Sequence, residues 1–330
     1  MKNVVILGAT GLVGEEVLKI LEQRNFPVKE LFLFASERSE GKSVIYKTDE
    51  VEIVSEYEEL IQKADIVFGC LDAPFAREIV PKFRGHAVVI DNSNAFRMSA
   101  DVPLVVPEVN PEKIKEHTGI IANPNCSTIQ MVVPLYPLHQ AAGIKRIIVS
   151  TYQSVSGMGR DAVDELQYEI ECLGLGQTIA KEEASALLHP IGGNIIPQIG
   201  EFEGSGYTSE EMKMVNETRK IFSDDTIAVT ATCVRIPVFV GHSEVVSVEL
   251  RKPMSAAQAC TLMKDAPGVT LLEDPQAYPM PAQVKGTDAV FVGRVRQDAA
   301  FENGLAMWLV ADNLRKGAAL NAVQIAELLV

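Results

Sequence analysis

The sequence predicts an α/β protein in which an N-terminal doubly wound parallel sheet is followed by an α+β domain with a mixed sheet. Up to about residue 125, short apolar runs alternate with amphipathic segments, as in βαβ units. A glycine-rich turn joins the first run to the first amphipathic segment. After residue 142, longer segments with loose apolar alternation follow, which favours a mixed or antiparallel sheet.

The chain opens with a predicted buried strand, a tight turn and a helix. Residues 4–7 form a continuous apolar run, and an amphipathic segment covers residues 15–24. The turn between them spaces Gly8, Gly11 and Gly14 as G-x-x-G-x-x-G. Such a turn lets backbone N–H groups and the helix N-terminus approach a pyrophosphate. The segment therefore predicts a dinucleotide site, although glycines that only pack a helix on a strand would have the same spacing.

The residues after the second predicted strand, 31–35, distinguish between the two nicotinamide cofactors. They are Ser36, Glu37, Arg38 and Ser39. An acidic residue at this point would bind the ribose 2′-hydroxyl of NAD, whereas Arg and Ser would bind the 2′-phosphate of NADP. Arg38 and the two serines favour NADP, and Glu37 is the residue that argues for NAD.

Two further predicted strands and a helix extend the first domain. Residues 66–69 and 87–90 are apolar runs, and residues 74–83 between them have a helical pattern. The second run ends in a polar segment that carries Arg97. Because ligands of such sheets bind beyond the carboxyl ends of the strands, Arg97 is either an anion-binding residue or an ordinary surface arginine.

One cysteine lies where a strand-like segment passes into a helix. The apolar run 119–122 leads into Asn-Pro-Asn-Cys-Ser-Thr at 123–128, and a helical pattern follows over 129–142. A helix N-terminus carries partial positive charge and unpaired N–H groups, which favour the thiolate that attacks carbonyls. Cys126 is therefore a candidate nucleophile, although a lone cysteine is more often an ordinary thiol.

The rest of the chain predicts longer strands and fewer helices. The strands are expected over 147–156, 227–236 and 244–250, and the helices over 161–172, 210–221 and 317–330. We expect the last helix to return to the first domain. The predicted division is a first domain of residues 1–127, completed by residues 316–330, and a second domain of residues 128–315.

Composition excludes several classes of protein. The 330 residues are 47% apolar and 22% charged, which is ordinary for two globular domains. A net charge of −14 argues against nucleic acid and anionic membranes as partners, and no apolar run is long enough to span a bilayer. The five cysteines are scattered and lack metal-ligand spacing, which suits a reducing cytoplasm. We therefore expect a cytoplasmic protein that holds no metal.

A series of ordered motifs runs along nearly the whole chain. They are Val-Ile-Leu-Gly-Ala-Thr-Gly-Leu-Val-Gly at 5–14, then the segments 91–97, 105–110, 123–128 and 153–157, the helix start at Glu210, and the segments 235–238, 241–243 and 312–318. In this order the motifs resemble the aspartate-β-semialdehyde dehydrogenase family. The resemblance implies reduction of L-aspartyl 4-phosphate to L-aspartate 4-semialdehyde by NADPH, in the biosynthesis of lysine, diaminopimelate, methionine and threonine.

The resemblance also implies roles for single residues. Cys126 is the implied nucleophile that forms a thioester, His242 the acid–base group, and Gln153 the residue that orients the substrate. The implied substrate-binding residues are Arg235 and Glu210 for the amino-acid end, and Arg97, Asn125 and Lys213 for phosphate. With the turn residues above, the expected cofactor-binding residues are Gly8, Thr10, Gly11, Leu12, Val13, Ser36, Arg38, Ser39, Ser156, Gly157 and Asn313. The second domain is implied to be catalytic and dimerising, in a homodimer or a dimer of dimers.

The residue types agree with the chemistry of reducing an acyl phosphate. The reaction needs a soft nucleophile, a hydride donor, cations for a carboxylate and a phosphate, and a proton-transfer group such as His, whose ordinary pKa is about 6.5. Two alternatives stay open: a reductase of N-acetylglutamyl-phosphate or glyceraldehyde-3-phosphate type, and a non-catalytic regulator that senses NADP(H). Cys126, His242 and Arg235 together argue against the regulator. One segment, Cys70-Leu71-Asp72-Ala73, departs from the family pattern, in which small residues are common.

Overall fold

The structure is a computed structural model that describes residues 1–179 and 185–330. It forms two compact units. Unit 1 comprises Met1–Asn125 with Gly317–Val330, and unit 2 comprises Cys126–Lys316. The division expected from the sequence, after residue 127 and before residue 316, lies within two residues of these bounds.

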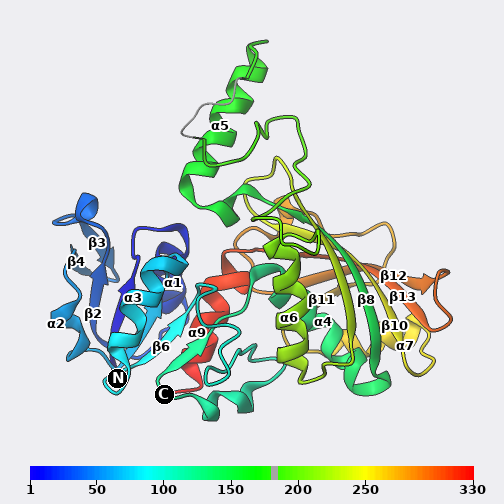
Figure 1. Cartoon of the computed structure of the whole chain (residues 1–330), viewed down its shortest axis with the longest axis horizontal. Helices are drawn as coiled ribbons and strands as arrows, with labels where there is room; N and C mark the ends of the chain where they lie inside the picture. Colours follow the sequence, from blue (N-terminus) through cyan, green and yellow to red (C-terminus); the bar gives the residue numbers. More distant parts are fainter. Residues whose placement is uncertain (180–184) are drawn as a thin grey trace. The chain divides into compact units, whose positions relative to one another are not determined.

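Unit 1 is built on a seven-stranded sheet with the order β3-β4-β2-β1-β5-β6-β7 (Figure 1). All neighbouring pairs are parallel except β3–β4. The strands are β1 (Lys2–Leu7), β2 (Val28–Phe34), β3 (Ser43–Tyr46), β4 (Asp49–Val54), β5 (Ile66–Gly69), β6 (Val88–Asp91) and β7 (Ile120–Ala122). Residues 4–7 of the central β1 are fully buried, which explains their continuous apolar run.

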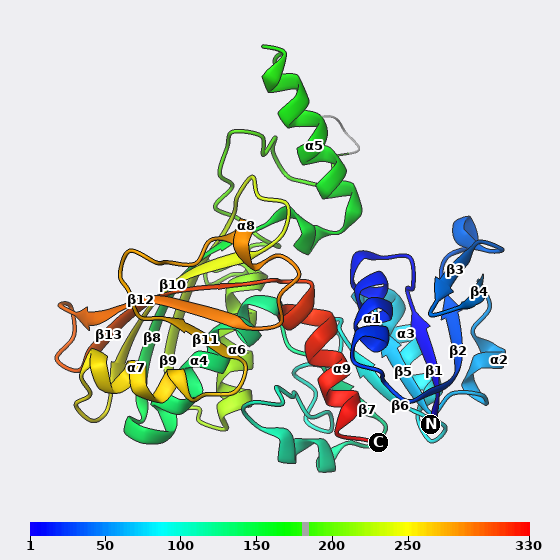
Figure 2. The same ribbon diagram turned by 180° about the vertical axis from the view of Figure 1, so that it is seen from behind.

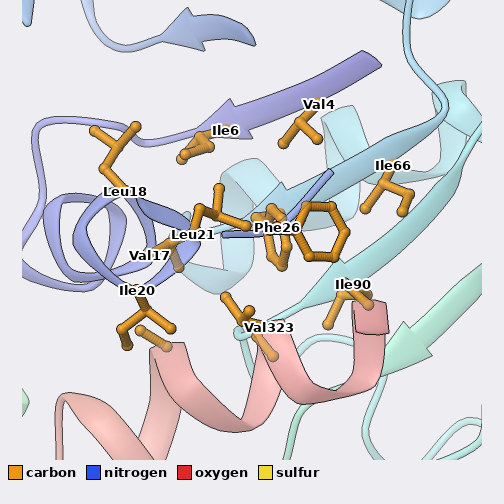
Figure 3. Packing of buried hydrophobic residues seen from close by; sticks show 14 of the residues in the cluster. Val4, Ile6, Val17, Leu18, Ile20, Leu21, Phe26, Ile66, Ile90 and Val323 are labelled. Atoms are coloured by element: carbon orange, nitrogen blue, oxygen red, sulfur yellow. The ribbon is translucent and has the colours of Figure 1, made fainter. Parts of the chain in front are cut away.

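The helices of unit 1 include the end of the chain. They are α1 (Leu12–Gln23), α2 (Glu58–Ile61), α3 (Ala73–Ile79) and α9 (Leu320–Glu327). Val323 of α9 lies in the same apolar cluster as Leu21, Phe26 and Ile90 (Figure 3). The buried Asn321 donates from Nδ2 to the carbonyl of Val105 at 3.0 Å and to Oδ1 of Asn123 at 2.7 Å. The last helix thereby fixes the polar segment that ends unit 1.

Unit 2 is built on a six-stranded mixed sheet with the order β11-β12-β13-β10-β8-β9 (Figure 2). The strands are β8 (Ile144–Gln153), β9 (Ala228–Arg235), β10 (His242–Leu250), β11 (Val269–Leu272), β12 (Val290–Asp298) and β13 (Gly304–Ala311). β8–β9 and β11–β12 are parallel pairs, and the other neighbours are antiparallel. The predicted α/β class with a mixed second sheet is therefore confirmed.

Helices cover one face of the second sheet. The helices of unit 2 are α4 (Cys126–Ala142), α5 (Arg160–Gly174), α6 (Ser209–Phe222), α7 (Ala256–Lys264) and α8 (Pro281–Val284). Along β10, Glu244, Val246 and Val248 are buried beneath α4, whereas Val245 and Ser247 on the other face are only half-buried. One face is thus closed by helices, and the other is open except near β13, where Trp308 Nε1 donates to the carbonyl of Pro279 at 2.8 Å. Within the described residues, none of the helices combines the length and hydropathy needed to cross a bilayer.

Two predicted elements have different bounds for local reasons. The strand expected over 147–156 starts at Ile144 and ends at Gln153, because the chain then enters a 3₁₀ turn over Val155–Met158 that ends at Gly159 with φ of 95°. The helix expected from residue 15 begins at Leu12, directly after the glycine turn. In both places the turn residues, not the apolar periodicity, set the limits of the element.

Candidate active site

Three strand ends of unit 2 bring polar side chains together. Gln153 ends β8, Arg235 ends β9 and His242 begins β10. The register pairs Gln153 with Arg235, and β10 runs antiparallel to β8, so the three residues lie at one edge of the sheet. Their exposed fractions are only 1%, 3% and 0%, respectively. The catalytic residues implied for this unit are therefore in a buried, low-dielectric setting, where charges and hydrogen bonds act strongly.

Cys126 lies at a helix N-terminus, as the sequence predicted, but α4 begins at Cys126 itself, three residues before the predicted start at residue 129. The helix packs against β8 and β10, and its last turn leads directly into β8, so its N-terminus faces the strand edge that carries Gln153. Burial lowers the pKa of Arg235, while the negative charges of Glu210 and of an ionised Cys126 oppose that shift. Arg235 and Cys126 are thus near enough to interact electrostatically, and the arginine favours the thiolate.

The first turn of α6 adds a carboxylate and an ammonium group to this edge. A capping box between Thr208 and Glu211 fixes the start of the helix. Glu210 Oε2 accepts from Lys213 Nζ at 2.8 Å, and Glu210 Oε1 accepts from Gln153 Nε2 at 3.2 Å. Glu210 is buried, and its partners hold it beside Gln153. Glu210 and Lys213 thus place one negative and one positive group at this edge. A substrate that carries both an ammonium group and anionic groups requires both.

Gly157 is the point at which the backbone comes closest to these side chains. A Cβ atom at this position would lie 3.2 Å from Arg235 Nη1 and 3.5 Å from His242 Nε2. Arg235 Nη1 also donates to the carbonyl of Ser154 at 2.7 Å. A side chain at residue 157 would therefore press on both groups, which gives the Ser-Gly sequence at 156–157 a steric reason.

His242 is fully buried and strongly perturbed. Burial, and secondly the charge of Arg235, lower its pKa to about 3, against the opposing effect of Glu210. Its Nδ1 atom accepts from the backbone N–H of Ser154 at 3.0 Å. Asn313 Oδ1 accepts from the N–H of Gly241 at 2.9 Å and from Ser154 Oγ at 3.0 Å. The imidazole is thus neutral at neutral pH, and a fixed network surrounds it.

A second buried acid lies two residue pairs behind the strand ends that carry His242 and Gln153. Glu244 pairs with Thr151 across β10 and β8, and is fully buried beneath α4. Within the described chain, its carboxyl oxygens and the amide of the buried Gln130 on α4 make no hydrogen bond to protein groups. Burial raises the pKa of Glu244 well above its ordinary 4.5, so the group is held as the neutral acid.

We expect Glu244→Gln to stabilise the protein increasingly as pH rises. The folded state holds a proton that the unfolded state loses above pH 4.5, so wild-type stability falls with rising pH until the raised folded pKa is reached. One such group contributes a slope of at most about 1.4 kcal/mol per pH unit. Denaturant midpoints measured at acidic and neutral pH should show a variant advantage only at the higher pH.

Glu249→Gln provides the matched control for that prediction. Glu249 belongs to the same strand, but Lys145 lowers its pKa. The ionised Glu249 therefore stabilises the protein above its ordinary pKa, and this stabilisation is lost as pH falls. Its pH dependence is thus opposite in sign to that of Glu244. An advantage of Glu244→Gln that is equal at both pH values would show that Glu244 is ionised in the folded protein.

The glycine turn of unit 1 has a geometry that can hold a pyrophosphate. Gly8 has φ of 85°, and a Cβ atom there would lie 2.3 Å from the carbonyl oxygen of Cys70. α1 begins at Leu12, and its N-cap residue, Gly11, has no side chain to bond the first N–H groups. Only glycine fits the first position, and the second leaves backbone donors for an anion. Both features suit a dinucleotide phosphate.

The residues after β2 form a short 3₁₀ turn over Glu37–Ser39. Ser36 and Arg38 are exposed, whereas Ser39 is buried. Arg38 is therefore accessible to a ligand phosphate, and Ser39 contacts the rest of the turn. The turn places the proposed 2′-phosphate residues directly beyond the carboxyl end of a strand, where ligands of such sheets bind.

Arg97 is buried, with an exposed fraction of 7%, so the alternative of an ordinary surface arginine is wrong. Its Nε donates to the carbonyl of Asn123 at 2.9 Å, and its Nη2 donates to the carbonyl of Asn92 at 2.8 Å. Asp91 lies nearby, and burial raises its pKa while Ser93 and Arg97 oppose that shift. Backbone carbonyls thus orient the guanidinium, as an anion-binding arginine requires.

Cys70, the departure from the family pattern, is not a second nucleophile. Its Sγ lies 3.7 Å from Asn92 Nδ2, and burial, with Asp91 as the second cause, raises its pKa to about 12. The thiol therefore stays protonated at neutral pH. Its backbone carbonyl, which faces Gly8, is its contribution to the glycine turn.

The predicted site residues divide between the two units. Unit 2 contains Cys126, Gln153, Ser156, Gly157, Glu210, Lys213, Arg235, His242 and Asn313, and unit 1 contains Gly8, Thr10, Gly11, Leu12, Val13, Ser36, Arg38, Ser39, Arg97 and Asn125. Sequence reasoning missed Ser154 and Glu244. Ser154 lies inside a quoted motif, but its contact with His242 depends on strand register. The only sequence feature that pointed to Glu244 was its position as a charged residue in an apolar strand.

A parallel sheet with a glycine-rich turn, followed by a mixed sheet and a helix that begins with a cysteine, is the arrangement that the sequence analysis expected of a semialdehyde dehydrogenase. Family models agree: "Semialdehyde dehydrogenase, NAD binding domain" matches residues 3–117, and "Semialdehyde dehydrogenase, dimerisation domain" matches residues 135–316. Within that class, the chain belongs to the aspartate-semialdehyde dehydrogenase family. The resemblance inferred from the motifs is confirmed.

Several relatives match over nearly their full length. The chain is 54% identical to aspartate-semialdehyde dehydrogenase of Aquifex aeolicus, covering 99% of this chain and 98% of that protein. It is 46% identical to the Bacillus subtilis enzyme, covering 98% and 96%. The crystal structure of aspartate semialdehyde dehydrogenase II of Vibrio cholerae, complexed with ASA, has a TM-score of 0.97 at 47% identity, covering 100% and 98%.

Proposed function

We propose that the protein reduces L-aspartyl 4-phosphate to L-aspartate 4-semialdehyde with NADPH and releases phosphate. The observation that carries this proposal is Cys126 at the start of α4, in one unit with the buried Arg235 and His242. The family supports the substrate class, since relatives at 46–54% identity have the aspartate-semialdehyde dehydrogenase name.

The chemistry assigned to the chain begins at Cys126. Its thiolate attacks the acyl carbon of the substrate, phosphate leaves, and a thioester remains on Sγ. When bound, NADPH supplies the hydride that reduces this carbonyl group. The resulting alkoxide collapses, releases the aldehyde and returns the thiolate. Gly8 and the uncapped start of α1 suit the pyrophosphate of the cofactor.

Opposite charges in the site suit the two ends of the substrate. Arg235 would bind the carboxylate with its planar fork, and Glu210 would bind the ammonium group. Arg97, Asn125 and Lys213 would bind the phosphate. A net charge of −14 makes such local cations necessary for a polyanionic substrate.

One assay tests this function. Enzyme, L-aspartate 4-semialdehyde, NADP and phosphate should give an absorbance increase from NADPH that depends on phosphate. N-acetylglutamate 5-semialdehyde and glyceraldehyde 3-phosphate provide the comparison, and a higher kcat/KM with either would contradict the proposed substrate. No turnover with any of the three would support a non-catalytic regulator.

We expect Arg38→Ala to separate NADP from NAD. The exposed Arg38 is proposed to pair with the 2′-phosphate, and losing a charge-assisted contact costs about 1.5–3 kcal/mol. The KM for NADP should therefore rise roughly ten- to a hundredfold, and NAD kinetics should stay near wild type. Steady-state kinetics with both cofactors measure this, and equal losses with both would assign Arg38 to the fold. A solved relative of Candida albicans, 26% identical, is described as a complex with NADP.

We also propose a homodimer, alone or paired into a dimer of dimers, through the open face of the second sheet. Apolar side chains gather on this face, and one of them, Ile148 of β8, is 42% exposed. Tyr152 and Trp308 lie side by side there with ring centroids 5.9 Å apart. The matched model of this unit is described as a dimerisation domain. Sedimentation of the purified chain measures the state, and a monomer would contradict it.

A further inference from the structure

Three asparagine side chains connect the C-terminal helix to the carboxyl edge of the first sheet. Asn321 of α9 donates from Nδ2 to Asn123 Oδ1 at 2.7 Å, and Asn123 donates from Nδ2 to Asn92 Oδ1 at 2.9 Å. Asn92 and Asn123 directly follow β6 and β7, which are parallel neighbours, and α9 packs against β6. We call these three side chains the amide chain. All of it belongs to unit 1, and Asn321 and Asn123 are buried.

Backbone carbonyl groups fix the direction of the amide chain. Each of the three amide nitrogens also donates to one carbonyl group, which belongs to Val105 for Asn321, to Ala318 for Asn123 and to Gly69 for Asn92, at 3.0, 3.1 and 3.1 Å. A carbonyl group can only accept, so the amide atom that faces it must be nitrogen. Each amide therefore has one orientation, and donation runs from α9 toward β5.

The guanidinium group of Arg97 lies on the backbone of two residues of this chain. Its Nε donates to the carbonyl of Asn123 at 2.9 Å, and its Nη2 donates to the carbonyl of Asn92 at 2.8 Å. The side chains of the same two residues are joined by the bond of 2.9 Å. The position of the arginine thus depends on how the segments after β6 and β7 are held.

The two carbonyl groups are not held equally well by their own backbone. The peptide unit with the Asn92 carbonyl also contains the N–H of Ser93, which donates to Asp91 Oδ1 at 3.2 Å. The peptide unit with the Asn123 carbonyl ends in Pro124, which has no N–H. That second peptide unit has no donor that could fix its plane, so the side chain of Asn123 is the nearest anchor for its carbonyl group.

We propose that Asn321 is a positioning residue for Arg97. Through the side chain of Asn123 it fixes the carbonyl group that accepts from Arg97 Nε, and it thereby determines the affinity for phosphate. This proposal rests on the phosphate-binding role proposed above for Arg97. It gives the C-terminal helix a part in the reaction in addition to its place in the apolar core of unit 1 (Figure 3).

Replacing Asn321 with alanine removes a donor from two buried acceptors. Asn123 Oδ1 and the carbonyl of Val105 both lose the N–H groups of residue 321. Buried polar groups without a hydrogen bond are unfavourable, so the Asn123 side chain should turn toward another donor. The Asn123 carbonyl then shifts, and Arg97 shifts with it.

We expect Asn321→Ala to raise the KM for phosphate about tenfold in the oxidative direction, because the guanidinium is no longer aligned with the anion. The KM values for NADP and for L-aspartate 4-semialdehyde should stay within about twofold of wild type. The strand end beside the glycine turn is held independently, since the carbonyl of Gly69 also accepts from the backbone N–H of Asn92 at 2.9 Å. An equal rise in all three KM values would show a general loss of structure and overturn the proposal.

Gln324→Ala is the matched control. Gln324 belongs to the same helix, but its Nε2 donates to Glu108 Oε1 at 3.2 Å and not to the amide chain. Its loss should leave the KM for phosphate near wild type. A tenfold rise in this control as well would assign the effect to the helix as a whole and not to Asn321.

Asn321→Asp separates the hydrogen bond from the volume of the side chain. Aspartate has nearly the same shape, but an oxygen replaces the nitrogen that faces Asn123 Oδ1 at 2.7 Å. Two acceptors at that distance repel each other, so we expect the KM for phosphate to rise at least as much as in Asn321→Ala. A wild-type KM for phosphate in Asn321→Asp would show that only the volume at residue 321 matters.

A double-mutant cycle tests whether Asn321 acts through Arg97. In that case Asn321→Ala should change the KM for phosphate by less than about twofold in an Arg97→Ala background. The same tenfold factor in both backgrounds would contradict the proposal.

A crystal structure of Asn321→Ala gives a readout that needs no turnover. We expect the distance from Arg97 Nε to the Asn123 carbonyl oxygen to increase from 2.9 Å to beyond about 3.5 Å. An unchanged bond would overturn the positioning role. If Arg97→Ala alone leaves the KM for phosphate at wild type, the phosphate-binding role of Arg97 is wrong, and this structure still decides whether Asn321 positions the arginine.

Discussion

Replacing Cys126 with serine is expected to lower kcat by several orders of magnitude while the protein stays folded and still binds NADP. The substitution keeps the shape of the side chain and its place at the start of α4. It replaces a thiol, a few per cent of which is ionised at about pH 7 even when free, with a hydroxyl that is far less acidic. Steady-state assays, circular dichroism and titration with NADP measure the three properties.

The other cysteines supply the controls. Cys172 on α5 and Cys233 on β9 are buried, and burial raises the pKa of Cys233 and of Cys70. Iodoacetamide should therefore label Cys126 first, and substrate should protect it. Mass spectrometry after a reaction with acyl phosphate but no NADPH should find the aspartyl adduct on the Cys126 peptide. An active Cys126→Ser enzyme, or an adduct on another cysteine, would remove the nucleophile from the mechanism.

Local signals in the sequence were sufficient for the central strands of the first sheet and for the place of Cys126 at a helix start. The apolar runs at 4–7 and 66–69 are central parallel strands that helices cover on both faces, so their composition alone identifies them. The position of Cys126 at a helix start also depends only on neighbouring residues. The edge hairpin of β3 and β4 was missed because its apolar alternation is short: only one of its faces, which carries Tyr46 and Ile53, packs into the core.

Other features depend on distant parts of the chain. β12 was not predicted, because Arg294 has φ of 55° and interrupts the alternation inside the strand. The Ser154–His242 contact joins residues 88 positions apart, and it requires the register of β8 with β10. The burial of Arg97 depends on carbonyls of Asn92 and Asn123. Sequence could name His242 and Arg97 as candidates, but tertiary packing determines what each of them contacts.

Arg235→Lys is expected to lower kcat/KM by about two to three orders of magnitude even though it keeps the charge. Arg235 is 3% exposed, and one nitrogen of its fork already donates to the carbonyl of Ser154. The remaining donors are available in a fixed plane, which suits both oxygens of a carboxylate. Lysine has a single ammonium group and, when buried, loses its proton more readily than arginine.

The kinetic pattern separates binding of the carboxylate from a general loss of structure. The KM for L-aspartate 4-semialdehyde should rise strongly, whereas the KM values for NADP and phosphate should change little. Alkylation of Cys126 should also slow, because Arg235 interacts electrostatically with that thiol. Arg251→Lys is the matched control, since Arg251 is 44% exposed and pairs with Asp224 at the surface. If KM for the semialdehyde stayed at its wild-type value in Arg235→Lys, the carboxylate would be bound elsewhere, and Arg235 would act on the thiol alone.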